Sequence, residues 1–211
     1  MKTKHLHPSI KSLALGLVAA AALASGNTAQ AALVFTITEQ LGGGVNTTYS
    51  GSLLFDLADA QARGNAYGET IVPNQAGLQV GPTLIGYLLL PIIQAGGPAS
   101  FGPGGVNSAA TSSGDTAGIN GSLGGVLLPT GYVSGATISG TSFYDIDFFG
   151  SGDPATLANL GLTAGTYVWN TQSGSFSDTI TLNIIPAVPE PSTFALLGLA
   201  GLGLGLLRRR R

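Results

Sequence analysis

Glycine and proline interrupt every apolar segment in the central part of this chain, which has 33 glycines and 11 prolines among 211 residues. Between the interruptions, apolar residues recur at every second position. Leu33, Phe35 and Ile37 lie on one face of a run whose other face is rich in threonine, and this period of two is typical of a strand with one buried side. Because glycine and proline end regular elements and favour turns, the pattern predicts short strands joined by turns.

Further runs along the chain indicate a mainly β domain, either a β-sandwich or a jelly roll. Short helices are expected over Leu54–Arg63 and from an Asp153 cap to Gly161,. Residues 95–125 are dominated by glycine, serine and alanine, so we expect loops or long connections there,. Strands are expected within Leu33–Thr38, Tyr49–Phe55, Gly77–Ile93, Val126–Val133, Ala136–Thr141, Phe143–Phe149, Thr166–Asn170 and Ser177–Ile185.

The first 31 residues have the three parts of a secretory signal peptide. Three lysines lie within residues 1–11, the stretch Ser12–Ala24 is apolar, and Ala29-Gln30-Ala31 is a small-x-small cleavage site. We predict that the secretion machinery exports the chain and that cleavage after Ala31 leaves Ala32 as the mature N-terminus. A retained anchor helix is the alternative, and the short apolar core argues against it.

The exported region, Ala32–Ala187, is strongly acidic. It has nine acidic residues and one basic residue, Arg63, so its formal charge is −8, although the whole chain carries only −2. This balance argues against nucleic acid and anionic membrane surfaces as partners. It suits a neutral polysaccharide, or an anionic one bridged by divalent cations.

The same region lacks the residues that most catalytic sites need. The chain has no cysteine, and its only histidines, His5 and His7, lie in the signal peptide. Cysteine nucleophiles, Ser-His-Asp triads, the usual zinc sites and lysine Schiff bases are therefore excluded from Ala32–Ala187. Any catalysis would have to depend on carboxylates, and we predict that the protein is not an enzyme.

The C-terminus has three parts in a fixed order. A proline-rich stretch, Val188-Pro189-Glu190-Pro191-Ser192-Thr193, leads into an uncharged apolar run, Phe194–Leu207, which is followed by Arg208, Arg209, Arg210 and Arg211. As a transmembrane helix the apolar run would be about 21 Å long, short of the roughly 30 Å hydrocarbon core. The terminal arginines place the C-terminus in the cytoplasm by the positive-inside rule.

This arrangement resembles the PEP-CTERM sorting signal of Gram-negative bacteria. The resemblance rests on Pro189-Glu190-Pro191, the apolar run and the arginine cluster. It implies recognition by an exosortase, a transient stay in the inner membrane, and delivery to the cell surface or an exopolysaccharide matrix. A permanent C-terminal membrane anchor is the alternative.

A second resemblance covers the end of the exported region. The sequence from Leu160 to Trp169, followed by Asp178-Thr179-Ile180-Thr181-Leu182-Asn183-Ile184, is similar to a recurrent ending of PEP-CTERM ectodomains. It implies a shared β domain and no particular activity.

Two pairs of residues are candidates for ligand binding. Asp145 and Asp147 are two apart on an expected strand and face the same way,, so they are a possible Ca²⁺ site; a solvated strand face is the simpler interpretation because Ca²⁺ needs six or more ligands. Tyr167 and Trp169 share a face and are candidates for stacking on a sugar. Packing inside the domain is the alternative for them.

We therefore predict an exported surface or matrix protein with a structural or interaction role in an exopolysaccharide biofilm. The first alternative is a Ca²⁺-dependent glycan-binding module. The second is a carboxylate-dependent enzyme that degrades exopolysaccharide, which two neighbouring aspartates on one strand fit poorly.

Overall fold

The structure is a computed structural model that describes residues 32–63, 68–82, 86–91, 93, 97–121, 124–145 and 153–188. These residues are mainly β and form two sheets, which confirms the predicted fold class at this level. The only helical elements among them are two single 3-10 turns, η1 (Leu57–Asp59) and η2 (Pro73–Gln75). The signal peptide and the C-terminal apolar run lie outside the described residues.

The first sheet has six strands in the order β12-β13-β1-β2-β11-β8. Its strands are β1 (Ala32–Glu39), β2 (Val45–Gly51), β8 (Thr111–Gly114), β11 (Ile138–Tyr144), β12 (Gly165–Ser173) and β13 (Phe176–Ile185). All neighbours are antiparallel except β1 and β13, which run parallel from the Ala32–Thr179 pair to the Thr38–Ile185 pair. This parallel pair distinguishes the sheet from the wholly antiparallel sheets of a jelly roll.

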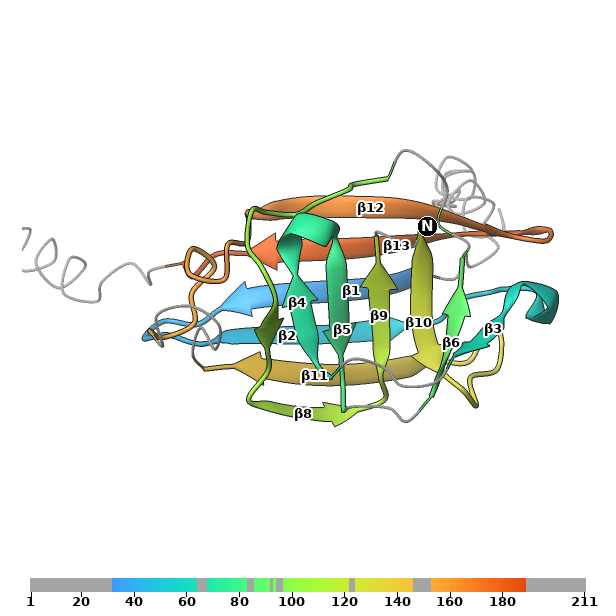
Figure 1. The fold of residues 1–211 in the computed structure, drawn as a ribbon, viewed down its shortest axis with the longest axis horizontal. Helices are drawn as coiled ribbons and strands as arrows, with labels where there is room; N and C mark the ends of the chain where they lie inside the picture. The colour runs from blue at the N-terminus through green and yellow to red at the C-terminus, as the bar shows by residue number, and fades with distance from the viewer. Residues whose placement is uncertain are drawn as a thin grey trace, which may run out of the picture. The chain divides into compact units, whose positions relative to one another are not determined.

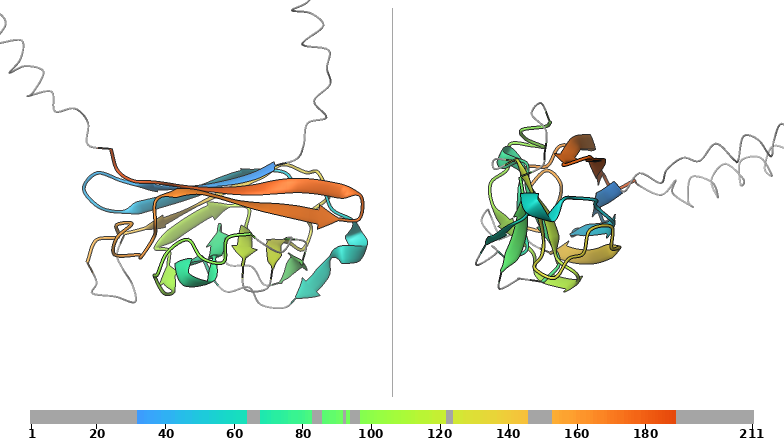
Figure 2. Two further views of the ribbon diagram at one scale, coloured as in Figure 1. Left: turned by 90° about the horizontal axis from the view of Figure 1, so that it is seen from above. Right: turned by 90° about the vertical axis from the view of Figure 1, so that its right-hand side faces the viewer.

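The second sheet has seven antiparallel strands in the order β3-β6-β10-β9-β5-β4-β7. They are β3 (Gln61–Arg63), β4 (Thr70–Val72), β5 (Gly77–Val80), β6 (Tyr87–Leu90), β7 (Asn107–Ser108), β9 (Ala117–Asn120) and β10 (Gly125–Pro129). In Figure 1 this sheet lies in front of the first, and its strands run across those behind. Figure 2 shows the two sheets edge-on as two layers.

The core lies between the layers and draws on both sheets. Leu33, Phe35 and Ile37 of β1 are fully buried, as the alternation predicted, and each such side chain contributes roughly 1.5–3 kcal/mol when it leaves water. Strand β13 follows the same rule, because its residues Ile180, Leu182 and Ile184 are buried. The second sheet contributes Ile71, Leu78, Val80, Ile119, Val126 and Leu128.

Both predicted helices are corrected by the structure. Only η1 forms within Leu54–Arg63, where the Asp56 carboxylate accepts a hydrogen bond from the Ala58 N–H; the following residues pair with β6 as β3 instead. After Asp153, a single turn begins at Thr156, whose hydroxyl accepts from the Asn159 N–H, so Asp153 is not its cap. The turn ends at Gly161, as predicted, with a positive φ of 66°.

Two strand boundaries also differ from the expectation. The second strand is Val45–Gly51 rather than Tyr49–Phe55, because its register against β1 continues back to the Glu39–Val45 pair. Strand β10 ends at Pro129, and Tyr132 lies in a turn in which its N–H donates to the Pro129 carbonyl. Of the expected strand Phe143–Phe149, residues 146–149 lie outside the described residues.

The loop-like stretch 95–125 contains more regular structure than we expected. It supplies β8 to the first sheet and β7 and β9 to the second. Its Phe101-Gly102-Pro103-Gly104 segment is held by backbone hydrogen bonds, from the Gly104 N–H to Gly161 O and from the Thr163 N–H to Phe101 O. Glycine is required at 104, since a Cβ there would lie 2.0 Å from the Leu160 carbonyl oxygen.

Candidate functional site: the sorting junction and an amide-lined groove

The end of the described chain is tied into the fold by β13. This strand pairs with β12 on one side and with β1 on the other, so both of its edges are hydrogen-bonded. Beyond it, the Ala187 N–H donates to Oε2 of Glu39 at 3.3 Å, and Oε1 of the same carboxylate accepts from the Leu157 N–H at 3.3 Å. Val188, the next residue and the last one described, is 71% exposed.

The predicted aromatic pair packs into the domain. Tyr167 and Trp169 lie on the same face of β12, as expected, and this face points inward. Trp169 is 1% exposed, and its indole N–H donates to the Pro98 carbonyl at 3.1 Å. The Tyr167 ring meets Phe101 edge-on at 6.0 Å between centroids, and its hydroxyl donates to Thr163 O.

For Trp169 this placement fits the packing alternative, whereas Tyr167 is only partly buried. The segment at Gly97 covers the indole so closely that a Cβ on Gly97 would lie 2.6 Å from Cδ1 of Trp169. Trp169 therefore has no free face to offer a ligand in this structure.

Of the predicted aspartate pair, Asp147 lies outside the described residues. Asp145 is exposed directly after β11, and its carbonyl accepts from the Ala155 N–H. Among the described residues, no group of three acidic, histidine or cysteine residues is placed to hold a metal ion. The Ca²⁺ site at Asp145 and Asp147 stays a prediction.

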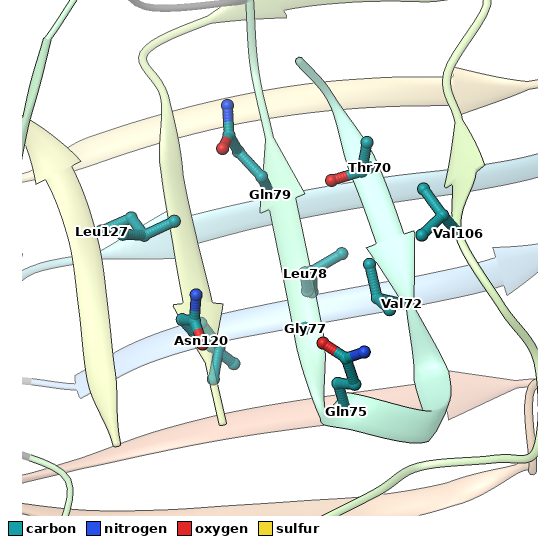
Figure 3. Close-up of a pocket in the computed structure, with 10 residues that line it drawn as sticks. Thr70, Val72, Gln75, Gly77, Leu78, Gln79, Val106, Asn120 and Leu127 are labelled. Atoms are coloured by element: carbon teal, nitrogen blue, oxygen red, sulfur yellow. The ribbon is translucent and has the colours of Figure 1, made fainter. Parts of the chain in front are cut away.

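A groove with a volume of about 380 Å³ lies on the outer face of the second sheet (Figure 3). Four polar side chains line it, namely Thr70 from β4, Gln75 from η2, Gln79 from β5 and Asn120 from β9. The apolar lining includes Val72, Val106 and Leu127. Ligand pockets commonly measure about 300–1,000 Å³, so the groove is large enough for a small ligand.

The register of the sheet explains why this face is hollow. Gly77 lies between Val72 and Asn120 on the neighbouring strands, and directly opposed residues share a face. In the next row, Gly118 lies between Gln79 and Leu127. In each row a residue without a side chain separates larger ones, and this leaves a depression between them.

Gln79 is a buried polar residue of the groove. It is 3% exposed, and its Nε2 has no hydrogen-bond partner among the described residues. Buried polar groups are nearly always paired, so an unpaired one needs an explanation. Figure 3 shows Gln79 and Gln75 toward opposite ends of the groove.

Our sequence interpretation missed this groove. Apart from Gln75, its polar residues occupy outward strand positions next to buried ones, as Gln79 does between Leu78 and Val80. Such positions look like ordinary solvated strand faces until the register brings the glycines together. Only the combination of glutamine or asparagine with glycine on β5 and β9 could have drawn attention to it.

A family model for the PEP-CTERM protein-sorting motif matches residues 187–211. The chain carries a PEP-CTERM sorting signal. This confirms the resemblance to the sorting signal, and the match begins two residues after β13 ends at Ile185. No curated protein and no solved structure matches the chain.

The PEP-CTERM signal implies that the protein is exported, processed by an exosortase and located at the cell surface or outside the cell. Within the match lie Val188, Pro189, Glu190 and Pro191 and the basic end Arg208–Arg211. No helix of the described residues is both long and apolar enough to span a membrane; the predicted membrane segment Phe194–Leu207 lies outside them.

The predicted signal-peptide cleavage site stays a prediction. Ala29 and Ala31 lie outside the described residues, and Ala32 is the first residue of β1. Cleavage after Ala31 would therefore leave β1 whole, with its pairing to β13 beginning at the new N-terminus.

Proposed function

We propose that this protein is a structural and interaction component of the cell surface or the exopolysaccharide matrix, released to that place by an exosortase. The observation that carries the proposal is the PEP-CTERM signal directly after the last strand of a β domain. The two facing sheets with a shared core support a β-sandwich as the architecture of that domain,.

The side chains favour an interaction role over catalysis. Several of the described carboxylates are used within the fold and bind other segments through their side chains: Glu39 accepts from the Ala187 N–H, and Asp59 accepts from the Ser173 hydroxyl at 2.6 Å. Oδ2 of Asp178 accepts from the Leu54 N–H at 2.7 Å. Carboxylates engaged in this way are poorly placed as general acids or bases for a substrate.

Intact-mass measurement of the protein from its own cells and medium tests the sorting part of the proposal. We expect a species that begins at Ala32 and ends near Val188–Pro191, with or without an added group. A membrane-bound species that begins at Ala32 and still carries Arg211 would mean a permanent anchor, and would remove the exosortase step.

Incubation with the producer's exopolysaccharide, with and without Ca²⁺, tests the role after sorting. Binding without loss of polymer mass supports the interaction role. Falling polymer mass would favour the enzyme. Retention that requires Ca²⁺, and that is lost on Asp145→Asn with Asp147→Asn, would favour the Ca²⁺-dependent module.

A further inference from the structure

We infer that the amide-lined groove on the outer face of the second sheet is a binding site for a neutral, hydroxyl-rich saccharide segment. This inference deepens the proposed function and depends on it, since it names the surface by which the exported domain would hold a polysaccharide. This groove is separate from the candidate pair Tyr167 and Trp169, of which Trp169 is buried.

The polar lining has the hydrogen-bonding capacity that a sugar needs. Each amide of Gln75, Gln79 and Asn120 has donors on nitrogen and an acceptor oxygen, and the Thr70 hydroxyl does both. Sugar hydroxyls are likewise donors and acceptors, so both kinds of group can be paired at once. The four side chains come from η2, β4, β5 and β9, which surround the groove rather than following one strand.

The amide nitrogen of Gln79 has a hydrogen bond still to donate, since its Nε2 has no partner among the described residues. Burial of its Nε2 without a partner is costly, so a hydrogen-bond acceptor at that position is favoured. A ligand hydroxyl at that end of the groove would satisfy the amide. A purely apolar ligand would leave it unpaired and gain nothing from the other amides.

The apolar lining fits the other chemical side of a sugar. A pyranose ring presents C–H groups on its faces, and Val72, Val106 and Leu127 offer aliphatic surface beside the amides. Gly77 between Val72 and Asn120 allows a flat ring to approach the sheet. The groove thus combines aliphatic contact with convergent polar groups, the usual composition of a ligand site.

The absence of charged residues from the described lining favours a neutral ligand. None of the described lining residues is charged, so a carboxylate or sulfate placed there would lose its hydration without gaining a partner, which is costly. The formal charge of −8 on Ala32–Ala187 also repels anionic polymers,. A neutral polysaccharide suffers neither penalty.

Affinity electrophoresis of the processed protein recovered from producing cells tests the inference. The probes are three neutral polysaccharides (laminarin, dextran and galactomannan) and the anionic alginate, each cast into the gel over a range of concentrations. We expect retardation by at least one neutral polymer and none by alginate. Competition by short oligosaccharides of the retarding polymer shows whether the site binds a short segment or prefers a long chain.

Two matched pairs of variants locate the site. Asn120→Trp fills the groove, whereas Asn170→Trp adds the same ring at an exposed position of β12 in the other sheet. Gln75→Ala removes an exposed amide from the groove, whereas Gln172→Ala removes an exposed amide from β12. We expect each groove variant to weaken binding by about tenfold, equivalent to about 1.4 kcal/mol, and the controls to stay within about twofold, with all melting temperatures close to that of the unaltered protein.

Each other result overturns the inference in a distinguishable way. Retardation that survives both groove variants keeps the matrix role but places the site elsewhere. Retardation only by alginate, or by no polymer, removes the neutral-saccharide site, while the mass measurement still judges sorting independently. Self-association that the groove variants abolish would make the groove an interface between two copies of the chain.

Discussion

Substitution of Tyr132 by phenylalanine should destabilise the domain, because one hydroxyl holds two chain segments together. This hydroxyl accepts from the Leu53 N–H at 2.8 Å and lies within donor distance of Ala136 O at 2.8 Å and Leu53 O at 3.1 Å. Its removal leaves the Leu53 N–H buried without a partner, at a cost of about 1–3 kcal/mol. The ring still stacks on Phe55 at 5.8 Å, so the loss comes from the hydroxyl alone.

Tyr144→Phe is the matched control. The Tyr144 hydroxyl is buried and has no hydrogen-bond partner among the described residues. Its removal takes away an unpaired polar group and leaves the ring, so the free energy of unfolding should stay the same or rise by about 1 kcal/mol. Both substitutions remove a tyrosine hydroxyl, but only Tyr132→Phe should lower the free energy of unfolding.

Urea unfolding followed by the fluorescence of Trp169 measures both effects. This residue is the only tryptophan of the chain and is buried, so its emission should shift when the domain opens. We expect a lower midpoint at unchanged slope for Tyr132→Phe, since an unchanged slope marks a change in stability alone. A loss below about 0.5 kcal/mol for Tyr132→Phe, or equal losses for both variants, would refute the reasoning.

Three further predictions concern packing, pH and sorting. Gly97→Ala should destabilise the domain by about 1–3 kcal/mol through overpacking, since the new Cβ would lie 2.6 Å from Cδ1 of Trp169; Gly131→Ala, with no atom within 4 Å, is the control in the same unfolding assay. Burial raises the pKa of the Asp178 carboxyl, and the hydrogen bond from the Leu54 N–H offsets this only in part. The stability that this carboxyl contributes is therefore fully present below the unfolded pKa of about 3.9, and it is lost as the pH rises through the folded pKa. Asp178→Asn should therefore gain stability relative to the unaltered protein as the pH rises from acid to neutral, and a constant difference across urea titrations would contradict this. Replacement of Arg208–Arg211 by alanine should remove the orienting charge and leave unprocessed chains, visible by intact mass as the retained C-terminus; normal processing would show that the arginines are dispensable.

The strands of the first sheet could be predicted where side chains alternate strongly. β1 and β13 have large apolar residues at every second position, and burial of these residues is enough to fix both the element and its inner face. The same pattern placed Tyr167 and Trp169 together on β12. It could not tell that Gly97 and Pro98, about 70 residues earlier in the chain, cover the indole, because that contact depends on tertiary packing.

The strands of the glycine-rich region could not be predicted for a physical reason. β8 is Thr-Ser-Ser-Gly and β9 is Ala-Gly-Ile-Asn, and short side chains give almost no alternation to detect. Their pairing is decided by the strands beside them. For example, Gly118 of β9 lies opposite Gln79 of β5 and Leu127 of β10. The groove depends on this register, so it could not be predicted from the pattern of residues along the chain.

The position of the sorting signal has a consequence for the fold that survives processing. β13 is held on both edges, by nine residue pairs with β12 and seven with β1, and Ile185 is its last residue. Beyond it, the Ala187 N–H donates to the Glu39 carboxylate at 3.3 Å, and the next residue, Val188, is exposed. Cleavage near Val188–Pro191 therefore removes no strand pairing and no core side chain of the described domain. Because the pairs on both sides of β13 remain, the domain should keep its stability when the tail is exchanged for another attachment. A protein that is transferred from the membrane to the cell surface requires this.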